Sequence, residues 1–303
     1  MNKIAIAIHG GASENYSFLH DHQKEFEHGM AQAVETGYSV LDKGGSALDA
    51  VEQAVAVLEN NPLFNAGKGS ALNCRGEVEM DASIMSGTDL QAGAVSMVRT
   101  VKNPIRLARL VMEETRHVFL SGYGALELAK KYGVEIEPES YFITPHQYEI
   151  FQNLNKIESM EEIQRKKMKG TVGAVALDLQ GNLAAATSTG GISNCLPGRI
   201  GDSCVIGAGC YANNNTCAVS GTGEGEYLIR GVVGHTISMM MEFDRSLQEA
   251  CDYVIHKRNQ RLRGEVGVIA LNKNGDFGIS FNTEIMKRAW KSTTQEVQIK
   301  LFN

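Results

Sequence analysis

The sequence has no apolar run long enough to cross a membrane and no basic block long enough to follow nucleic-acid phosphates. Its 303 residues carry a formal net charge of −6, with 29 Lys and Arg against 35 Asp and Glu. The apolar run near the amino terminus, Ile4 to Ile8, is too short for a secretory signal. We therefore expect a cytoplasmic protein that binds neither nucleic acid nor membrane and acts on a small molecule or a protein.

Proline and cysteine are also scarce. Five prolines argue against extended linkers, and no internal repeat is visible. The six cysteines include no C-x-x-C pair, which disfavours a zinc site, and a chain of this size does not need disulfides to fold. Since 43% of the residues are hydrophobic, the chain can bury a core as one large domain or two small ones.

The hydrophobic pattern alternates between strand-like and helix-like segments. Ser46 and Asp49 form a capping-box pattern before "ALDAVEQAVAVLE", and Asn103-Pro104 is typical of a helix start. Strand patterns gather in blocks, with helices between them, at 4–8, 76–85, 92–98, 171–178, 182–189, 204–212, 216–221, 267–271, 275–281 and 284–290. This order favours a four-layer α/β/β/α sandwich with two stacked, mainly antiparallel sheets, and a doubly wound sheet is the alternative.

A polar, lysine-rich segment precedes one of these strands. We expect residues from about 155 to 169 to form a mobile surface linker, because the apolar periodicity fades there. The strand "TVGAVALD" then starts abruptly at Gly170-Thr171. One interpretation is a loop glycine followed by a β-branched strand residue. The other is a cleavage site.

A threonine becomes a strong nucleophile only when a base removes its proton. An N-terminal α-amine, with a pKa of roughly 7.7–8.0, is such a base on the same residue. Cutting the Gly170–Thr171 bond would expose this amine. Gly170 would also let the Thr171 hydroxyl approach its carbonyl for an N-to-O acyl shift.

Four further clusters combine glycine with polar residues. They are "HGGAS" from His9, "LFNAGKGSALN" from Leu63, "TSTGGISNCLPGRIGDS" from Thr187 and "SGTGEGE" from Ser220. For any one of them alone, a turn is the better interpretation than a site. Their joint occurrence favours a site.

Taken in order, "IHGGA", "NPLFNAGKGS", "MDASIM", "GTVGAVALD", "GNLAAATSTGG", "PGRIGDS", "GAGCYA" and "GTGEGE" resemble the plant-type asparaginases, or isoaspartyl peptidases, of the N-terminal-nucleophile hydrolases. The resemblance covers nearly the whole chain. It implies one domain, residues 1–303, that cleaves itself into an α subunit (1–170) and a β subunit (171–303). It also implies an (αβ)₂ particle and catalysis without a cofactor.

The resemblance assigns the catalytic roles. Thr171 is the nucleophile, and Thr189 hydrogen-bonds to its hydroxyl. The side chain of Thr222 and the backbone N–H of Gly223 form the oxyanion hole. His9 is then structural, because the α-amine of Thr171 already serves as the base.

The resemblance also assigns substrate binding. Arg199 takes the α-carboxylate of the substrate, and Asp202 takes the α-ammonium group together with the Gly225 carbonyl. Residue chemistry fits this reading, because a free aspartyl group needs one cation and one anion close together. A surface salt bridge worth about 0–1 kcal/mol is the alternative for "GRIGD" read alone.

Asn65 matches a family position that lines the nucleophile pocket, with an Asx turn as the alternative. The loop around it resembles one that holds a structural sodium ion through main-chain carbonyls. The carbonyls implied by this match belong to Leu58, Glu59, Asn61, Phe64, Ala66 and Lys68.

One departure from the family pattern lies beside the oxyanion hole, where Glu224 replaces a smaller polar residue. The expected function is hydrolysis of β-aspartyl dipeptides and asparagine through a covalent β-aspartyl-threonine. Glycosylasparaginase activity is the nearest alternative. A phosphate- or nucleotide-binding loop at "SGTGEGE" and a catalytically silent binding module are alternatives from other classes.

Overall fold

The computed structural model describes residues 3–156 and 170–303. The linker expected at about residues 155–169 lies, from residue 157 onward, outside the described residues. Gly170 and Thr171, the expected cleavage site, fall at the start of the second described segment.

A large sheet of eight strands crosses the molecule. Neighbouring strands are antiparallel except for one parallel pair at the edge, β3 and β4. In spatial order the strands are β12 (Gln295–Lys300), β11 (Ile285–Ser292), β1 (Ala5–Ser13), β5 (Val172–Leu177), β6 (Leu183–Thr189), β2 (Met80–Ser86), β3 (Ala92–Val98) and β4 (Phe119–Ser121).

A second sheet of four antiparallel strands stacks on the large one. Its order is β10 (Phe277–Phe281), β9 (Val266–Asn272), β8 (Cys217–Gly223) and β7 (Cys210–Ala212). Strands β8 and β9 contact β1, β5 and β6 of the large sheet. Small apolar side chains, including Ala7, Ala185 and Ala218, fill the space between the sheets together with larger ones.

Helices cover the two outer faces. Against the large sheet pack α2 (Gln23–Asp42), α3 (Ala47–Glu59) and α4 (Pro104–Glu114), and against the small sheet pack α10 (Val233–Glu242) and α11 (Leu247–Asp252). The other helices of residues 3–156 and 170–303 are α1 (Ser17–Asp21), α5 (Gly122–Lys131), α6 (Glu139–Phe142), α7 (Pro145–Leu154), α9 (Gly225–Gly231), and the 3₁₀ and π segments Gly67–Gly69, Asp202–Cys204, Tyr253–Arg258 and Asn259–Arg261.

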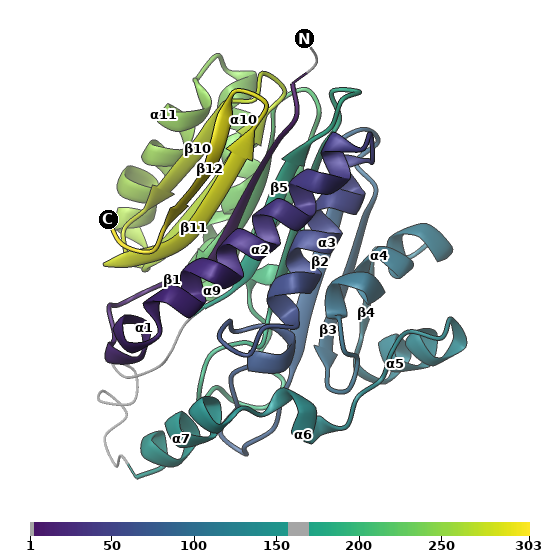
Figure 1. Ribbon diagram of the computed structural model, residues 1–303, viewed down its shortest axis with the longest axis vertical. Helices are drawn as coiled ribbons and strands as arrows, with labels where there is room; N and C mark the ends of the chain where they lie inside the picture. Colours follow the sequence, from purple (N-terminus) through teal and green to yellow (C-terminus); the bar gives the residue numbers. More distant parts are fainter. Residues whose placement is uncertain (1–2, 157–169) are drawn as a thin grey trace.

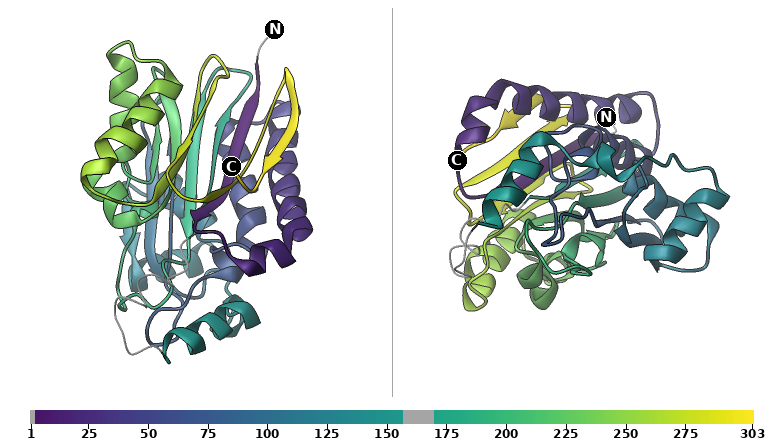
Figure 2. Two further views of the ribbon diagram at one scale, coloured as in Figure 1. Left: turned by 90° about the vertical axis from the view of Figure 1, so that its left-hand side faces the viewer. Right: turned by 90° about the horizontal axis from the view of Figure 1, so that it is seen from below.

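The edge-on view in Figure 2 shows the four layers, with α2 and α3 on one side and α10 and α11 on the other. In the face-on view of Figure 1, the long helix α2 crosses in front of the large sheet. Separate apolar clusters lie in the three spaces between layers. The predicted α/β/β/α sandwich is therefore confirmed, and the doubly wound sheet is not.

The sequence predicted two helix starts correctly from capping residues. Ser46 and Asp49 form the predicted capping box, and Pro104 occupies the first turn of α4. The "HGGAS" segment is not the expected turn. It continues β1, whose pairing with β11 is interrupted by a bulge between His9 and Ala12. Strand β12 was not predicted, since its residues are polar and partly exposed.

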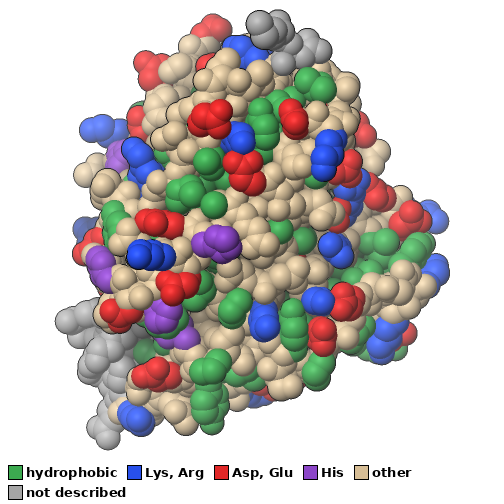
Figure 3. All heavy atoms as spheres, viewed as in Figure 1, with side chains coloured by type: hydrophobic (Ala, Val, Ile, Leu, Met, Phe, Trp, Pro, Cys, Tyr) green, Lys and Arg blue, Asp and Glu red, His purple; other side chains and the backbone are tan. Residues whose placement is uncertain are grey.

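In the part of the chain that is described, no helix is both long and apolar enough to span a bilayer. The face shown in Figure 3 mixes acidic and basic side chains, without a broad patch of one sign.

Candidate active site

Thr171 lies directly before β5 and is 4% exposed. Its hydroxyl donates a hydrogen bond to the Thr189 hydroxyl, with 3.4 Å between the oxygens. Thr189 ends β6, and the neighbouring pair of Val172 with Ser188 fixes the register of β5 against β6. The antiparallel pairing of two strands therefore brings these two hydroxyls together, as expected from the family resemblance.

The Gly170 carbonyl accepts two hydrogen bonds. Asn65 Nδ2 donates to it at 2.8 Å, and Thr189 Oγ1 donates at 3.1 Å. Asn65 is itself held by its contacts with Gly191 O and Ala71 N. Two donors on one carbonyl polarise it and would stabilise an oxyanion formed there. The Asx-turn reading of Asn65 is wrong, because its side chain reaches across the fold.

Thr222 and Gly223 end β8 in the smaller sheet. The Thr222 hydroxyl oxygen accepts a hydrogen bond from the backbone N–H of Ala12 at 3.1 Å, which leaves its own proton to be donated elsewhere. Gly11 lies against the nucleophile, since a Cβ added to it would stand 3.2 Å from the Thr171 nitrogen. The bulged segment of β1 therefore bridges Thr171 and Thr222.

Arg199 makes a bidentate ion pair that the sequence did not predict. Its Nε donates to Glu226 Oε1 at 2.9 Å, and its Nη2 donates to Glu226 Oε2 at 2.7 Å. The Arg199 side chain is 14% exposed and the Glu226 side chain is 53% exposed. Burial works against the charge of Arg199, but the hydrogen bonds and charge of Glu226 outweigh it and raise the arginine pKa.

Asp202 lies close to Arg199 across Gly225. A Cβ on Gly225 would stand 2.7 Å from Asp202 Oδ1 and 3.0 Å from Arg199 Nη2, so only glycine leaves the space between them open. Asp202 is 3% exposed, and its Oδ2 has no hydrogen-bond partner within the described chain. Burial raises the Asp202 pKa to about 6, against the attraction of Arg199. A buried carboxylate with an unused oxygen invites a cationic ligand.

Asp81 binds the backbone of the loop that carries Arg199 and Asp202. The sequence did not single it out. Its carboxyl oxygens accept the backbone N–H of Met97 at 3.1 Å and that of Gly201 at 3.4 Å. Burial raises the Asp81 pKa to about 7, and the hydrogen bonds oppose this effect. Asp81 also pairs with Thr189 in the β2–β6 ladder, so one strand position connects the nucleophile to the Arg199–Asp202 loop.

His9 contacts the nucleophile directly. Its Nδ1 lies 3.1 Å from the Thr171 carbonyl oxygen, and its Nε2 lies 2.9 Å from Ser220 Oγ. Burial lowers the pKa of His9 to about 3, so the ring is neutral at physiological pH. No local sequence signal predicts this contact, because the partners are 162 and 211 residues away.

The last residues of α3 and the loop after it carry the carbonyls implied for sodium binding, those of Leu58, Glu59, Asn61, Phe64, Ala66 and Lys68. The carbonyl of Leu58 accepts backbone hydrogen bonds from Asn60 and Asn61. Those of Asn61, Phe64 and Ala66 accept one each, so each of these three oxygens keeps a second lone pair that suits a hard cation. Among residues 3–156 and 170–303, no group of three or more His, Cys, Asp or Glu side chains could hold a metal ion.

The Glu59 carboxylate is not part of that set. It is fully buried and accepts hydrogen bonds from Ser188 Oγ at 2.6 Å, Asn103 Nδ2 at 3.0 Å and Ile105 N at 3.0 Å. Burial raises the Glu59 pKa to about 7, although these donors act in the opposite direction.

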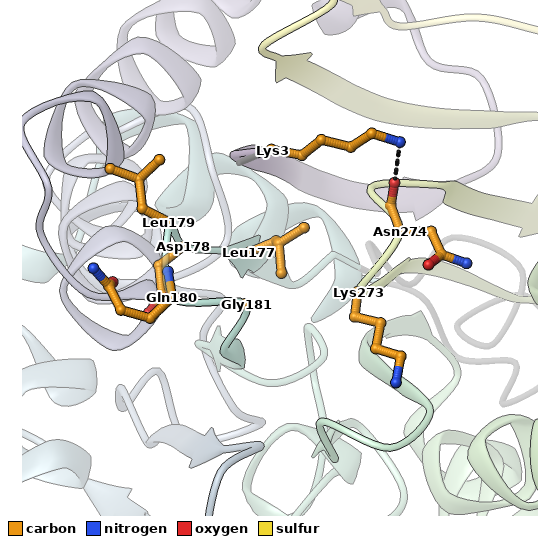
Figure 4. A pocket seen from close by; sticks show the side chains of 8 residues that line it. All are labelled: Lys3, Leu177, Asp178, Leu179, Gln180, Gly181, Lys273 and Asn274. Atoms are coloured by element: carbon orange, nitrogen blue, oxygen red, sulfur yellow. Dashed lines mark hydrogen bonds between the residues drawn. The ribbon is translucent and has the colours of Figure 1, made fainter. Parts of the chain in front are cut away.

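Two of the pockets in the described structure differ in their distance along the fold from Thr171. One of about 720 Å³ lies at the far end of β5, where Lys3, Gln180 and Lys273 surround it (Figure 4). It is at the opposite end of the strand from Thr171. The other, of about 400 Å³, runs from Ile192 to Arg199 and Glu226. The second pocket adjoins the residues expected to bind substrate.

Comparison with known proteins gives a consistent result. A model of the family described as "Asparaginase" matches residues 2–301. An isoaspartyl peptidase/L-asparaginase from Mus musculus is 46% identical over 275 residues, covering 90% of this chain and 83% of the relative. An isoaspartyl peptidase from Escherichia coli K12 is 45% identical over 299 residues, covering 96% and 93%. A human isoaspartyl peptidase/L-asparaginase is 45% identical over 277 residues, covering 91% and 89%.

Proposed function

Since the chain belongs to the asparaginase family, we propose that it cleaves itself before Thr171 and then hydrolyses β-aspartyl dipeptides and L-asparagine, releasing L-aspartate. One observation carries the proposal. Thr171 donates to Thr189, while Thr189 and Asn65 donate to the Gly170 carbonyl. The nucleophile, a proton acceptor and two oxyanion donors thus meet at one peptide bond.

Self-cleavage follows from these contacts. The Thr171 hydroxyl oxygen attacks the Gly170 carbonyl carbon while its proton passes to Thr189, and Thr189 passes its own proton to the carbonyl oxygen, to which Asn65 also donates. A C–O bond forms, the C–N bond breaks, and this proton moves from the Gly170 oxygen to the leaving Thr171 nitrogen. Water then hydrolyses the ester. This leaves a carboxylate on Gly170 and a free α-amine on Thr171.

The substrate's aspartyl group docks between the two charges. Its α-carboxylate binds the planar donor fork of Arg199, which requires Glu226 to move aside. Its α-ammonium binds Asp202, with the Gly225 carbonyl as a second acceptor. The unused Oδ2 of Asp202 supports this assignment, because an ammonium would supply the missing donor.

Hydrolysis reuses the same threonine. Its α-amine accepts the hydroxyl proton, and Oγ1 attacks the substrate's β-carbonyl. The Thr222 hydroxyl and the Gly223 N–H stabilise the resulting oxyanion. The leaving amine of the substrate takes this proton from the Thr171 α-amine as the C–N bond breaks. A β-aspartyl ester remains on Thr171. Water activated by the same α-amine then releases aspartate.

We extend the proposal to three further properties. The carbonyls of the Leu58–Lys68 loop would bind sodium structurally, and exchange of sodium for a bulky organic cation should then lower the melting temperature. Two processed chains would form an (αβ)₂ particle, which sedimentation would measure. The protein would reside in the cytoplasm, which fractionation would test.

The activity is tested with a product assay. Purified, matured protein should release aspartate from a β-aspartyl dipeptide and from asparagine, and Thr171→Ala should release none. We expect the dipeptide to react faster than asparagine. Glycosylasparagine as a third substrate tests the alternative activity. Matured wild-type protein that releases no aspartate from the β-aspartyl dipeptide or from asparagine would contradict the proposal.

A further inference from the structure

We propose that His9 is a positioning residue for the nucleophile: its Nδ1–H fixes the carbonyl of Thr171, and Ser220 holds the ring in that orientation. The inference rests on the proposed function, since it concerns the nucleophile of that reaction.

The hydrogen-bond partners assign the tautomer of the ring. Nδ1 lies 3.1 Å from a carbonyl oxygen, and a carbonyl can only accept, so Nδ1 carries the proton. Nε2 of the neutral ring is then an acceptor, and the Ser220 hydroxyl at 2.9 Å donates to it. Rotation of the ring would break both bonds.

The network continues beyond Ser220. The Thr187 hydroxyl lies 2.7 Å from Ser220 Oγ and 2.9 Å from the carbonyl oxygen of Gly209. We assign the single Ser220 proton to His9 Nε2 at 2.9 Å, because the other acceptor, the Ala186 carbonyl oxygen, is farther away at 3.3 Å. The Thr187 proton is then the one available for the contacts with Ser220 and Gly209. Gly209 packs against the Asp202 carboxyl, so the network runs from the nucleophile to the ammonium site across the two sheets.

Local geometry keeps space for the ring. His9 on β1 pairs with Gly173 on β5. A Cβ on Gly173 would stand 2.5 Å from His9 Nε2 and would clash with the Ser220 hydroxyl. The glycine opposite His9 therefore permits the bond between His9 and Ser220.

Cleavage makes the hydrogen bond from His9 to the Thr171 carbonyl more important. It removes the covalent link on the amine side of Thr171, which then keeps its peptide bond to Val172 and a 3.4 Å contact with Thr189. The His9 bond fixes the carbonyl, and so restrains rotation about the Cα–C bond that carries the amine and the side chain. Small misplacements of a reacting group can reduce the rate by about 10²-fold.

The experiment compares two amides at position 9. An asparagine nitrogen can stand where Nδ1 stands, whereas a glutamine nitrogen reaches the place of Nε2. Matured His9→Asn should keep kcat within a few-fold of wild type. His9→Gln and His9→Ala should lose about 10²-fold in kcat with KM nearly unchanged. Ile8→Val, a packing change at the adjacent buried position, is the control and should leave kcat unchanged.

A His9→Ala protein that folds but stays uncleaved, while His9→Asn cleaves, also supports the proposal. Equal losses in His9→Asn and His9→Gln, wild-type kcat in His9→Ala, or a loss confined to KM would overturn it. If the His9 variants do not fold, ¹⁵N imidazole spectra of the wild type decide, because a proton on Nε2 would overturn the assignment. A wild-type protein that releases no aspartate instead refutes the proposed function, while the tautomer remains measurable.

Discussion

Glu226 occupies the donor fork of Arg199 that the substrate's carboxylate would use. Both oxygens of Glu226 are engaged, at 2.9 Å from Nε and 2.7 Å from Nη2. Because the Glu226 side chain is 53% exposed, solvent competes for it and the pair is worth at most about 1 kcal/mol. An incoming carboxylate can therefore displace it at small cost.

Replacing Glu226 by Gln should lower KM for a β-aspartyl dipeptide by up to about fivefold, the equivalent of that 1 kcal/mol, with kcat little changed. Steady-state kinetics measures this. Glu224→Gln is a matched control, because the Glu224 carboxylate accepts the Glu265 N–H at 3.0 Å, whereas the two donors of the arginine fork go to Glu226. A rise in KM for Glu226→Gln would mean that Glu226 orients Arg199 and does not compete with substrate.

Asp202 should add a second acid limb to the pH profile. The Thr171 α-amine must be neutral to act as a base, so kcat/KM should fall tenfold per unit below about pH 8. Asp202 must be charged to bind an ammonium, and burial raises its pKa to about 6. The slope of log kcat/KM against pH should therefore change from about 1 to about 2 below pH 6. A slope that stays near 1 down to pH 5 would exclude this role for Asp202.

Removing one donor from the scissile carbonyl should slow self-cleavage. Asn65→Ala and Asn65→Asp both remove the Nδ2 donor to Gly170, and each should slow cleavage by about 10²-fold. The aspartate variant keeps an oxygen for the Ala71 N–H. If Asn65→Asp cleaves at the wild-type rate, the role of Asn65 is limited to holding the Ala71 loop.

Glu59 should make stability depend on pH. Its pKa is raised from 4.5 to about 7 by burial, so the folded state favours the protonated form. Its contribution to the unfolding free energy is complete below about pH 4.5 and is lost as pH rises through about 7. Glu59→Gln should therefore gain melting temperature relative to wild type between pH 5 and pH 8. A difference that does not change with pH would contradict this.

The sequence predicted what depends on local chemistry or ordered motifs. The capping box of Ser46 and Asp49 predicts the start of α3 from a few neighbouring residues. Pro104 predicts the start of α4 in the same way. Motif order identified Thr171 and Thr189, which the structure places 3.4 Å apart.

Contacts made only by the folded sheets could not be predicted in this way. Ser220 contacts His9 from 211 residues away, and Glu226 meets Arg199 through a loop whose path no periodicity reveals. Strand β12 was missed because a polar edge strand lacks the alternation that marks a half-buried one.

The most direct test of the account is the intact mass of the purified protein over time. The account predicts that the 303-residue chain gives way to fragments of 170 and 133 residues (303 − 170 = 133), and that Thr171→Ala stays whole. A wild-type chain that remains intact indefinitely, or a Thr171→Ala chain that still yields these fragments, would contradict it.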